Sequence, residues 1–319
     1  MPLVVTLTMN PAVDLSTSTA RVEPVHKLRC RSPRRDPGGG GVNVARVIHR
    51  FGVPTLALYP AGGLVGGRLG ELLEGELVQA HAIPICGETR EDFTVFDEHS
   101  GEQYRFFLPG PHLRSAEWLA CLGALANLDA RPEVICASGG LPPGVPDDFY
   151  ARLAEIAANL GARFVLDTSG APLRAALETR VDLIKPNLRE LRELSGAALD
   201  NDDALIATCR ALIEHRRVGA VALTMGAEGA ILVTAREAWR AAALPVRPVS
   251  SAGAGDSFLG AMVWAMVTGR SDLEAFRYGV AGGASAVSAS GAELCHPKDV
   301  HRLVKDVEVL TMNLPRPAA

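Results

Sequence analysis

The sequence has little that would direct the chain to a membrane, to nucleic acid or to an oxidising compartment. Its nearest candidate for a membrane span, residues 258–267, is about ten residues long, whereas a span needs roughly 20. The amino terminus, M-P-L-V-V-T-L-T-M-N, has neither the basic segment nor the apolar run of a signal peptide. The formal net charge of −4 leaves no basic footprint for nucleic acid. The six cysteines are scattered without a C-x-x-C pair, which argues against a zinc site or a disulfide framework. We therefore expect a cytoplasmic protein, in a reducing compartment, with a small-molecule partner.

Three common nucleotide-binding motifs are absent as well. There is no G-x-x-x-x-G-K-[ST] segment and no protein-kinase H-R-D or D-F-G set, so neither of those two classes applies. Four glycines at 38–41 precede an amphipathic segment, but Asn43 stands where the third glycine of a dinucleotide fingerprint would be. A dinucleotide-binding dehydrogenase is therefore disfavoured.

The composition is typical of a folded protein, since 48% of the 319 residues are hydrophobic and 21% are charged. Apolar, β-branched segments alternate with amphipathic ones along most of the chain, which predicts a parallel sheet with helices on both faces. Two stretches break this alternation. Residues 15–37 are polar, basic and punctuated by proline, and residues 91–98 and 103–108 predict a hairpin around Ser100 and Gly101. Together they predict a second, smaller sheet that would act as a lid.

The same patterns set the expected bounds of the elements. The predicted strands of the main sheet are residues 3–8, 55–61, 82–85, 134–137, 164–167, 183–184, 220–223, 231–233 and 239–243. The predicted helices are residues 42–52, 66–78, 116–128, 147–160 and 202–215, one that carries Glu190, and those that begin at 254, 273 and 298. Ligands bind at the carboxyl ends of parallel strands, and polar or small residues stand at four such ends: Asp14, 138–144, 185–187 and 224–229. Small residues fill 278–291, so that segment would pack closely against a nucleotide or a neighbouring helix.

Residues 250–260, S-S-A-G-A-G-D-S-F-L-G, predict a glycine-rich turn that leads into a helix. The free N–H groups and the dipole at such a helix start attract an anion such as phosphate. A carboxylate at Asp256 is out of place beside an anion unless it takes a proton from the hydroxyl that attacks the phosphate. The alternative is that Asp256 only caps the helix. The segment alone does not decide between the two.

Other residues fit phosphoryl transfer, and each has a structural alternative. The glycines at 38–41 allow close backbone approach to a ligand, or form a flexible turn. Arg90 and Arg105 would suit a phosphate, or would be solvated arginines at a sheet edge. Asn187 and Glu190, one helical turn apart, would hold hydrated Mg²⁺, or would cap a helix.

Three motifs resemble those of a known family. G-G-G-G-V-N-V-A-R at 38–46, S-S-A-G-A-G-D-S-F at 250–258 and K-P-N-L-R-E at 185–190 are similar to sequences of the PfkB (ribokinase-like) carbohydrate kinases, and the resemblance runs from end to end. It implies an α/β fold, a three-layer α/β/α sandwich with a mostly parallel central sheet. It also implies one kinase domain over residues 1–319, with a small β-sheet lid formed from about 15–37 and 88–109.

The resemblance further implies roles for individual residues. Asp256 would be the catalytic base, and the transferring phosphoryl group would be held by Gly253, Ala254 and Gly255. The sugar phosphate would be bound by Asp14, Lys27, Gly39, Gly40, Asn43, Arg90 and Arg105. ATP would be bound by Lys185, Asn187, Thr224, Gly226 and Gly229, and Mg²⁺ would be ordered through water by Glu190. A monovalent cation, K⁺, would be surrounded by the backbone carbonyls of Ser250, Ala252, Ala286, Ala289 and Gly291. The lid strands would pair with those of a second subunit to give a homodimer, with Lys27 near the interface.

Shorter segments narrow the resemblance to one branch of the family. H-K-L-R-C at 26–30, S-G-E-Q-Y-R-F at 100–106 and L-P-P-G at 141–144 are similar to the 6-phosphofructokinases that enteric bacteria have in this family. The implied reaction is ATP-dependent phosphorylation of fructose 6-phosphate at its C1 hydroxyl, which gives fructose 1,6-bisphosphate in glycolysis. Tagatose-6-phosphate kinase and fructose-1-phosphate kinase are the alternatives within the family, and a non-catalytic sugar-phosphate sensor is the alternative outside enzymes. Gly140 departs from that branch, which has a serine there, and this leaves the sugar preference open.

Overall fold

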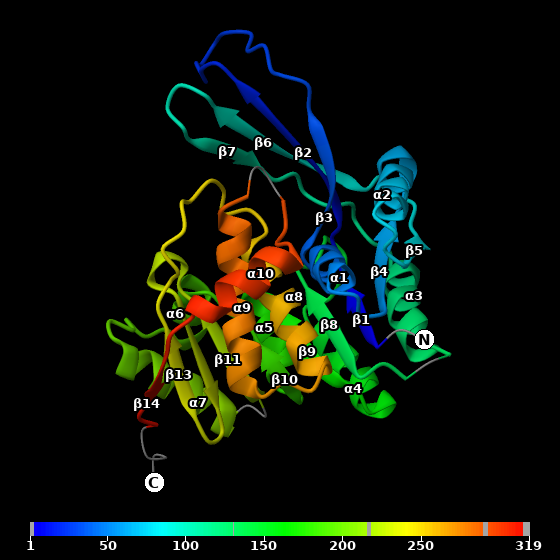
Figure 1. Ribbon diagram of the computed structural model, residues 1–319. Helices are drawn as coiled ribbons and strands as arrows, with labels where there is room; N and C mark the ends of the chain where they lie inside the picture. Colours follow the sequence, from blue (N-terminus) through cyan, green and yellow to red (C-terminus); the bar gives the residue numbers. More distant parts are fainter. Residues whose placement is uncertain (1–2, 130, 216–217, 290–292, 315–319) are drawn as a thin grey trace.

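A ten-stranded sheet runs through the body of the protein in the computed structural model, which describes residues 3–129, 131–215, 218–289 and 293–314 (Figure 1). The strand order is β14-β13-β12-β11-β10-β9-β8-β1-β4-β5. From β5 to β11 neighbouring strands are parallel, whereas β12, β13 and β14 are added antiparallel at one edge. The strands are β1 Val4–Leu7, β4 Thr55–Ala61, β5 Ala80–Pro84, β8 Val134–Ser138, β9 Arg163–Asp167, β10 Val181–Ile184, β11 Val218–Thr224, β12 Ala230–Thr234, β13 Ala238–Ala241 and β14 Val309–Met312.

Helices cover both faces of this sheet, because alternate side chains of the buried strands point to opposite sides. In β1, Val5 and Leu7 pack in one core with Tyr150, whereas Val4 packs in the other core with Val47. One layer consists of α3 Ser115–Ala126, α4 Phe149–Leu160, α5 Gly170–Ala176, α6 Leu188–Ser195 and α7 Asp202–His215. The other consists of α1 Gly40–Arg50, α2 Gly63–Gly75, α8 Ala254–Val267, α9 Asp272–Val287 and α10 Pro297–Leu303. The predicted three-layer sandwich is confirmed.

A second sheet of four strands projects above the body, as Figure 1 shows at the top. We call it the small sheet; its strands, in spatial order, are β3 Arg34–Gly38, β2 Ala12–Thr19, β6 Arg90–Asp97 and β7 Gln103–Phe106. β6 and β7 form the predicted antiparallel hairpin, and β2 lies parallel to β6. One expectation was wrong. Asp14 was placed at the carboxyl end of the first main-sheet strand, but the turn at Asn10 and Pro11 already leads into β2, so Asp14 belongs to the small sheet.

The predicted elements agree with the observed ones within two residues at the bounds compared, apart from α2. That helix was expected at 66–78 but spans Gly63–Gly75. Its start is fixed from a distant loop, because Glu88 accepts a hydrogen bond from the Val65 N–H (2.8 Å) and Thr89 from the Gly62 N–H (3.1 Å). Two short elements, α5 and β14, were not predicted. A further two single turns of 3₁₀ helix cover Gly226–Glu228 and Val304–Asp306.

The small residues of α9 pack against α8, which settles the alternative between a nucleotide and a helix for this part of the segment. A methyl group at Gly282 would come within 2.6 Å of the Ser257 carbonyl oxygen and 2.8 Å of the Ala261 Cβ. A methyl group at Gly279 would likewise come within 3.0 Å of the Phe258 ring. This close approach holds the first turn of α8, which contains Asp256, in place. Within the described part of the chain, no helix has the length and apolar character needed to cross a bilayer.

We expect Gly282→Ala to destabilise the fold by about 1–3 kcal/mol, because the added methyl group must push α9 away from α8. Gly283→Ala is the matched control. Its methyl group would meet the Ala254 carbonyl oxygen at 3.5 Å, an ordinary contact, so the gain in helix propensity should stabilise the protein by up to ~1 kcal/mol. Urea unfolding of the two variants measures both effects. Equal unfolding midpoints would show that α8 and α9 do not depend on this close contact.

Candidate active site

A cavity of about 300 Å³ lies between the small sheet and the carboxyl edge of the main sheet. Its lining comes from β2, β6 and β7 on one side and from the ends of β8 and β9 and the starts of α1, α6 and α8 on the other. The residues that line it are Asp14, Gly39, Gly40, Asn43, Arg90, Asp92, Arg105, Phe107, Ser138, Gly139, Gly140, Asp167, Thr168, Ser169, Glu190, Ala252, Gly253 and Asp256. Eight of the predicted residues for the sugar phosphate, the phosphoryl group and the base are thus brought together: Asp14, Gly39, Gly40, Asn43, Arg90, Arg105, Gly253 and Asp256.

Asp256 lies in the first turn of α8 and faces this cavity. The turn before it is possible because Gly253, at φ 71°, adopts the left-handed conformation that glycine tolerates. One carboxylate oxygen accepts a hydrogen bond from the Asn43 side-chain amide at 2.9 Å. Burial raises the pKa of Asp256 to about 6, against the Asn43 hydrogen bond, which lowers it. A carboxylate in this state is a stronger base than one in water.

Lys185 brings a positive charge beside the Gly253–Gly255 turn. Its ammonium lies 3.4 Å from where a Cβ at Gly255 would be, and 3.2 Å from an oxygen of Asp167. Burial would lower the pKa of Lys185, but the neighbouring carboxylates of Asp167 and Asp256 raise it above its usual value. Lys185 therefore stays charged beside N–H groups that lack helical partners, an arrangement that suits a phosphate.

The glycines before α1 are rigidly held, which excludes the flexible-turn alternative. Gly39 has φ 103°, and a side chain at Gly40 would overlap the Ser138 hydroxyl. The helix start is tied down by Thr8, whose hydroxyl accepts from the Val42 N–H at 2.6 Å. The backbone of Gly39 and Gly40 is thus exposed to the cavity at fixed positions.

The two arginines of the small sheet differ in their surroundings. Arg90 is largely buried and donates to the carbonyls of Leu108 (3.0 Å) and Asn10 (3.3 Å), besides pairing with Asp92 at 3.1 Å. Arg105 is exposed and lies over the ring of Phe107, 4.9 Å from its centroid. Both line the cavity, so neither is merely a solvated residue at a sheet edge.

Lys27 lies elsewhere, exposed in the connection between β2 and β3 and away from the cavity wall. Its predicted role depends on a second subunit and stays a prediction.

Asn187 and Glu190 form a reciprocal capping box at the start of α6. The Asn187 side chain accepts from the Glu190 N–H at 2.9 Å, and Glu190 accepts from the Asn187 N–H at 2.9 Å. The capping alternative is therefore realised, yet Glu190 also lines the cavity. Burial and the charge of Asp167 raise the pKa of Glu190. The carboxylates of Glu190 and Asp167 repel each other at this wall, and a divalent cation bound beside them would relieve that repulsion.

The remaining residues predicted for ATP lie next to this wall, at the end of β11. Thr224 forms an isolated bridge with Asn187, and its N–H donates to the Pro186 carbonyl at 3.0 Å. Gly226 and Gly229 bound the turn that follows, with φ 59° and 94°. These residues form one continuous edge with Lys185.

The two segments predicted for K⁺ are adjacent. The N–H groups of Val249 and Ser250 donate to the Val287 carbonyl at 2.8 and 3.2 Å, which brings Ser250 and Ala252 beside Ala286 and Ala289. The carbonyl of Ala286 accepts from the Ala289 N–H at 3.0 Å. Gly291, the fifth predicted carbonyl, lies outside the described residues.

Sequence reasoning missed the cavity residues at the end of β9. Asp167 accepts hydrogen bonds from the Ser138 hydroxyl and the Lys185 ammonium, both at 3.2 Å, and so joins the ends of the neighbouring strands β8, β9 and β10. A signal was present, because D-T-S-G follows an apolar strand at 164–167. The other lining residues that the sequence did not indicate are Asp92, Phe107, Thr168 and Ser169, whereas Ser138, Gly139 and Gly140 belong to the strand end expected at 138–144.

The chain is similar in sequence and in structure to known proteins. The chain is 42% identical over 301 residues to ATP-dependent 6-phosphofructokinase isozyme 2 of Mycobacterium tuberculosis strain H37Rv, covering 94% of this chain and 88% of that protein. It is 35% identical over 304 residues to the Escherichia coli K12 protein of the same name, covering 95% and 98%. The structure of Escherichia coli phosphofructokinase-2 in complex with potassium matches with a TM-score of 0.91 at 34% identity, over 96% of this chain and 99% of that one. The same Escherichia coli protein has been solved with fructose-6-phosphate and in a tetrameric inhibited form.

The model of the family described as pfkB family carbohydrate kinase matches residues 3–299. With the relatives above, this match covers nearly the whole chain. The protein belongs to the pfkB family of carbohydrate kinases.

Proposed function

We propose that this protein transfers the γ-phosphoryl group of ATP to the C1 hydroxyl of fructose 6-phosphate and releases fructose 1,6-bisphosphate and ADP. The observation that carries the proposal is the position of Asp256. It stands at a helix start, on the wall of a cavity, with a raised pKa and one oxygen held by Asn43. The two relatives named 6-phosphofructokinase favour fructose 6-phosphate over other sugar phosphates.

The chemistry follows from these positions. The sugar's C1 hydroxyl gives its proton to the Asp256 carboxylate while its oxygen attacks the γ-phosphorus, and the bond to the bridging oxygen of ADP breaks. The N–H groups at Gly253–Gly255 and the Lys185 ammonium stabilise the charge on the transferring group. Arg90 and Arg105 bind the phosphate that the sugar already carries, and Asp14, Asn43 and the glycines before α1 bind its hydroxyls.

The nucleotide and the cations belong to the opposite wall. ATP lies along the edge formed by Lys185, Asn187, Thr224, Gly226 and Gly229. Glu190 would hold Mg²⁺ through water, with Asp167 as the second carboxylate on that wall. Mg²⁺ would neutralise part of the charge on the phosphates. The carbonyls of Ser250, Ala252, Ala286 and Ala289 suit K⁺, in keeping with the potassium complex of the Escherichia coli protein.

We further infer that both sheets belong to one kinase domain, residues 1–319, in which the small sheet acts as the lid of the cavity. Homodimerisation through the small sheet is proposed because its outer parts are exposed, including Leu28 and the apolar residues at 106–108. In that dimer Lys27 lies near the interface. A cytoplasmic location is favoured by the six free thiols.

The proposed reaction predicts a clear preference for fructose 6-phosphate, measured as kcat/KM in a coupled ADP-release assay with Mg²⁺ and K⁺. Tagatose 6-phosphate, fructose 1-phosphate and ribose are the comparison substrates. A preference for either of the other sugar phosphates would keep the mechanism and reassign the substrate. If none of them is turned over by protein that still binds ATP, the sensor alternative replaces the kinase.

Asp256→Asn is expected to lower kcat by roughly 10²–10⁴-fold, because an amide cannot accept the proton of the attacking hydroxyl. Binding of fructose 6-phosphate and ATP, followed by calorimetry, should change little. Asp203→Asn is the control: it makes the same change on an exposed residue in the first turn of α7, which is not among the residues that line the cavity. A kcat of Asp256→Asn close to that of the wild type would refute the role of Asp256 as base.

The pH dependence of kcat/KM should show an acid limb near pH 6. Burial is the main cause that raises the pKa of both Asp256 and Asp14 to about 6, and in Asp14 the charges of Asp92 and Asp256 contribute to the rise. Because the base works only when deprotonated, kcat/KM falls as the pH drops below about 6 and is level above it. Asp14→Asn should reduce the slope of that limb from two protons towards one. A profile that stays level down to pH 5 would contradict the raised pKa values.

A further inference from the structure

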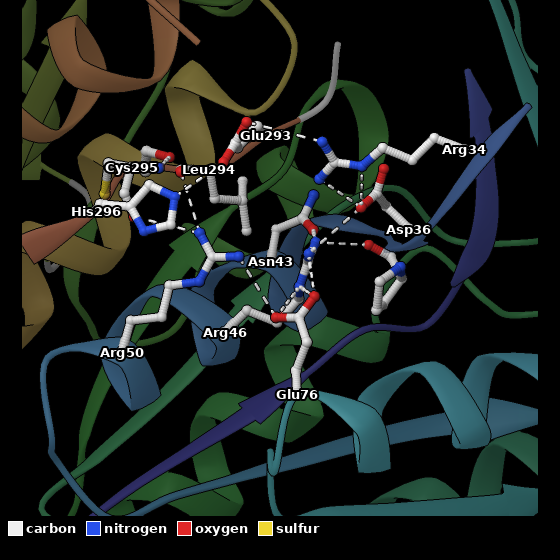
Figure 2. A network of polar contacts seen from close by, with 12 residues as sticks. Arg34, Asp36, Asn43, Arg46, Arg50, Glu76, Glu293, Leu294, Cys295 and His296 are labelled. Carbon is white, nitrogen blue, oxygen red and sulfur yellow. Dashed lines mark hydrogen bonds and ion pairs between the residues drawn. The ribbon is translucent and has the colours of Figure 1, made fainter. Parts of the chain in front are cut away.

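Arg46 carries a positive charge into the protein interior, where its side chain is 1% exposed (Figure 2). It lies on α1, one turn after Asn43. Glu76 lies at the end of α2. Both oxygens of its carboxylate lie 3.0 Å from the Arg46 Nε, which donates to them, and one of the oxygens also pairs with Nη2. Burial would raise the pKa of Glu76, but the guanidinium of Arg46 holds it below its usual value. The charge of Arg46 is thereby neutralised at the end of the guanidinium that points away from Asn43.

The other end of the guanidinium determines which way the Asn43 amide points. Arg46 Nη1 donates to the Asn43 Oδ1 at 3.1 Å. Because a guanidinium has only donors, the oxygen of the amide must face Arg46, and the NH₂ group must face away from it. That NH₂ group donates to Asp256 Oδ2 at 2.9 Å. The chain of bonds therefore has one possible direction, from Arg46 through Asn43 to Asp256.

The same nitrogen of Arg46 also contacts the small sheet. Nη1 donates to the Pro37 carbonyl in β3 at 2.9 Å, and Nη2 lies 4.0 Å from Asp36 of the same strand. The end of β3 and the amide of Asn43 are thus bonded to one planar NH₂ group. A lysine at this position has a single ammonium and cannot reproduce the fork to Glu76 together with both of these bonds.

We propose that Arg46 is a positioning residue for the phosphoryl transfer: it fixes the orientation of Asn43, and through Asn43 the orientation of Asp256, relative to the small sheet. The proposal rests on the role of Asp256 proposed above. Nothing in it requires Arg46 to touch the substrate.

Within the described part of the chain, five polar side chains on separate elements act on Asp256. They are Asn43 on α1, Asp14 on β2, Arg105 on β7, Asp167 on β9 and Lys185 at the end of β10. The charges of Asp167 and Lys185 act in opposite directions on the Asp256 pKa, whereas the Asn43 bond lowers it. If Asn43 turns away, that lowering is lost, and the acid limb of the pH profile should move to higher pH.

Arg46→Lys tests the proposal, and Arg50→Lys is its matched control. Arg50 lies one turn further along α1, pairs with the same Glu76 at 3.5 Å and donates to the Leu294 carbonyl at 3.1 Å, but it makes no contact with Asn43 in the described structure. We expect Arg46→Lys to lower kcat by roughly tenfold, as small misplacements of reacting groups do, and to move the acid limb upward. Arg50→Lys should leave both unchanged. Equal effects of the two substitutions would overturn the proposal.

A double-mutant cycle separates positioning from general support of the fold. In an Asn43→Ala background, Arg46→Lys should reduce kcat no further, because the residue through which Arg46 acts is gone. Reductions that multiply would overturn the proposal. Should Arg46→Lys fail to fold, Arg46→Met combined with Glu76→Gln is the second variant. It removes both charges together, which folded proteins tolerate better than the loss of one, and the outcomes stated above for kcat apply to it.

Loss of activity in Asp256→Asn with an unaffected Arg46→Lys would reject only this inference. An active Asp256→Asn would reject the proposed function itself.

Discussion

A buried guanidinium needs its charge balanced and its donors satisfied, and around Arg46 four parts of the chain meet to do so. Glu76 brings the end of α2, Pro37 brings the end of β3, and Asn43 brings the start of α1. Arg50, bound to Glu76, adds the segment before α10 through the Leu294 carbonyl (Figure 2). The helices α1 and α2, the segment before α10 and strand β3 of the small sheet are therefore joined close to the candidate active site, where Asn43 lines the cavity.

Two helix starts meet at the cavity wall through the hydrogen bond between Asn43 and Asp256, and both depend on glycine. At the start of α1, Gly39 and Gly40 bring the backbone against Thr8 and Ser138, and before α8, Gly253 turns the chain with φ 71°. The start of α8 directs N–H groups towards the proposed place of the transferring phosphoryl group, and the start of α1 presents its backbone to the proposed place of the sugar hydroxyls. The close packing of Gly282 on α8 then keeps the second start from moving. Close approach therefore requires glycine at residues 40 and 282, whereas a positive φ favours it at residues 39 and 253.

Local patterns were enough to predict most of the main sheet, because its strands and helices have strong apolar periodicity. They failed where a distant partner decides: α2 begins at Gly63 because Glu88 and Thr89 bind its first N–H groups. The residues of the candidate site also differ in whether local sequence was enough to find them. Asp256 and the glycines could be found from one short segment each, but Asp167 acquires its importance from Ser138 and Lys185, which are distant in sequence. Asp14 was assigned to the wrong sheet because a two-residue turn does not show where the next strand pairs. The predicted role of Lys27 depends on an interface with a second subunit, which a single chain does not contain.

Three glycines on the cavity wall differ in how strongly the backbone resists a side chain at their position. Gly39 and Gly139 have φ of 103° and 111°, so the backbone itself resists any side chain there. Gly140 has an ordinary backbone conformation and open space around the place of its Cβ. A side chain at residue 140 would therefore cost the scaffold little. Because Gly140 lines the cavity, such a side chain would change the shape of the proposed substrate pocket and leave the fold as it is.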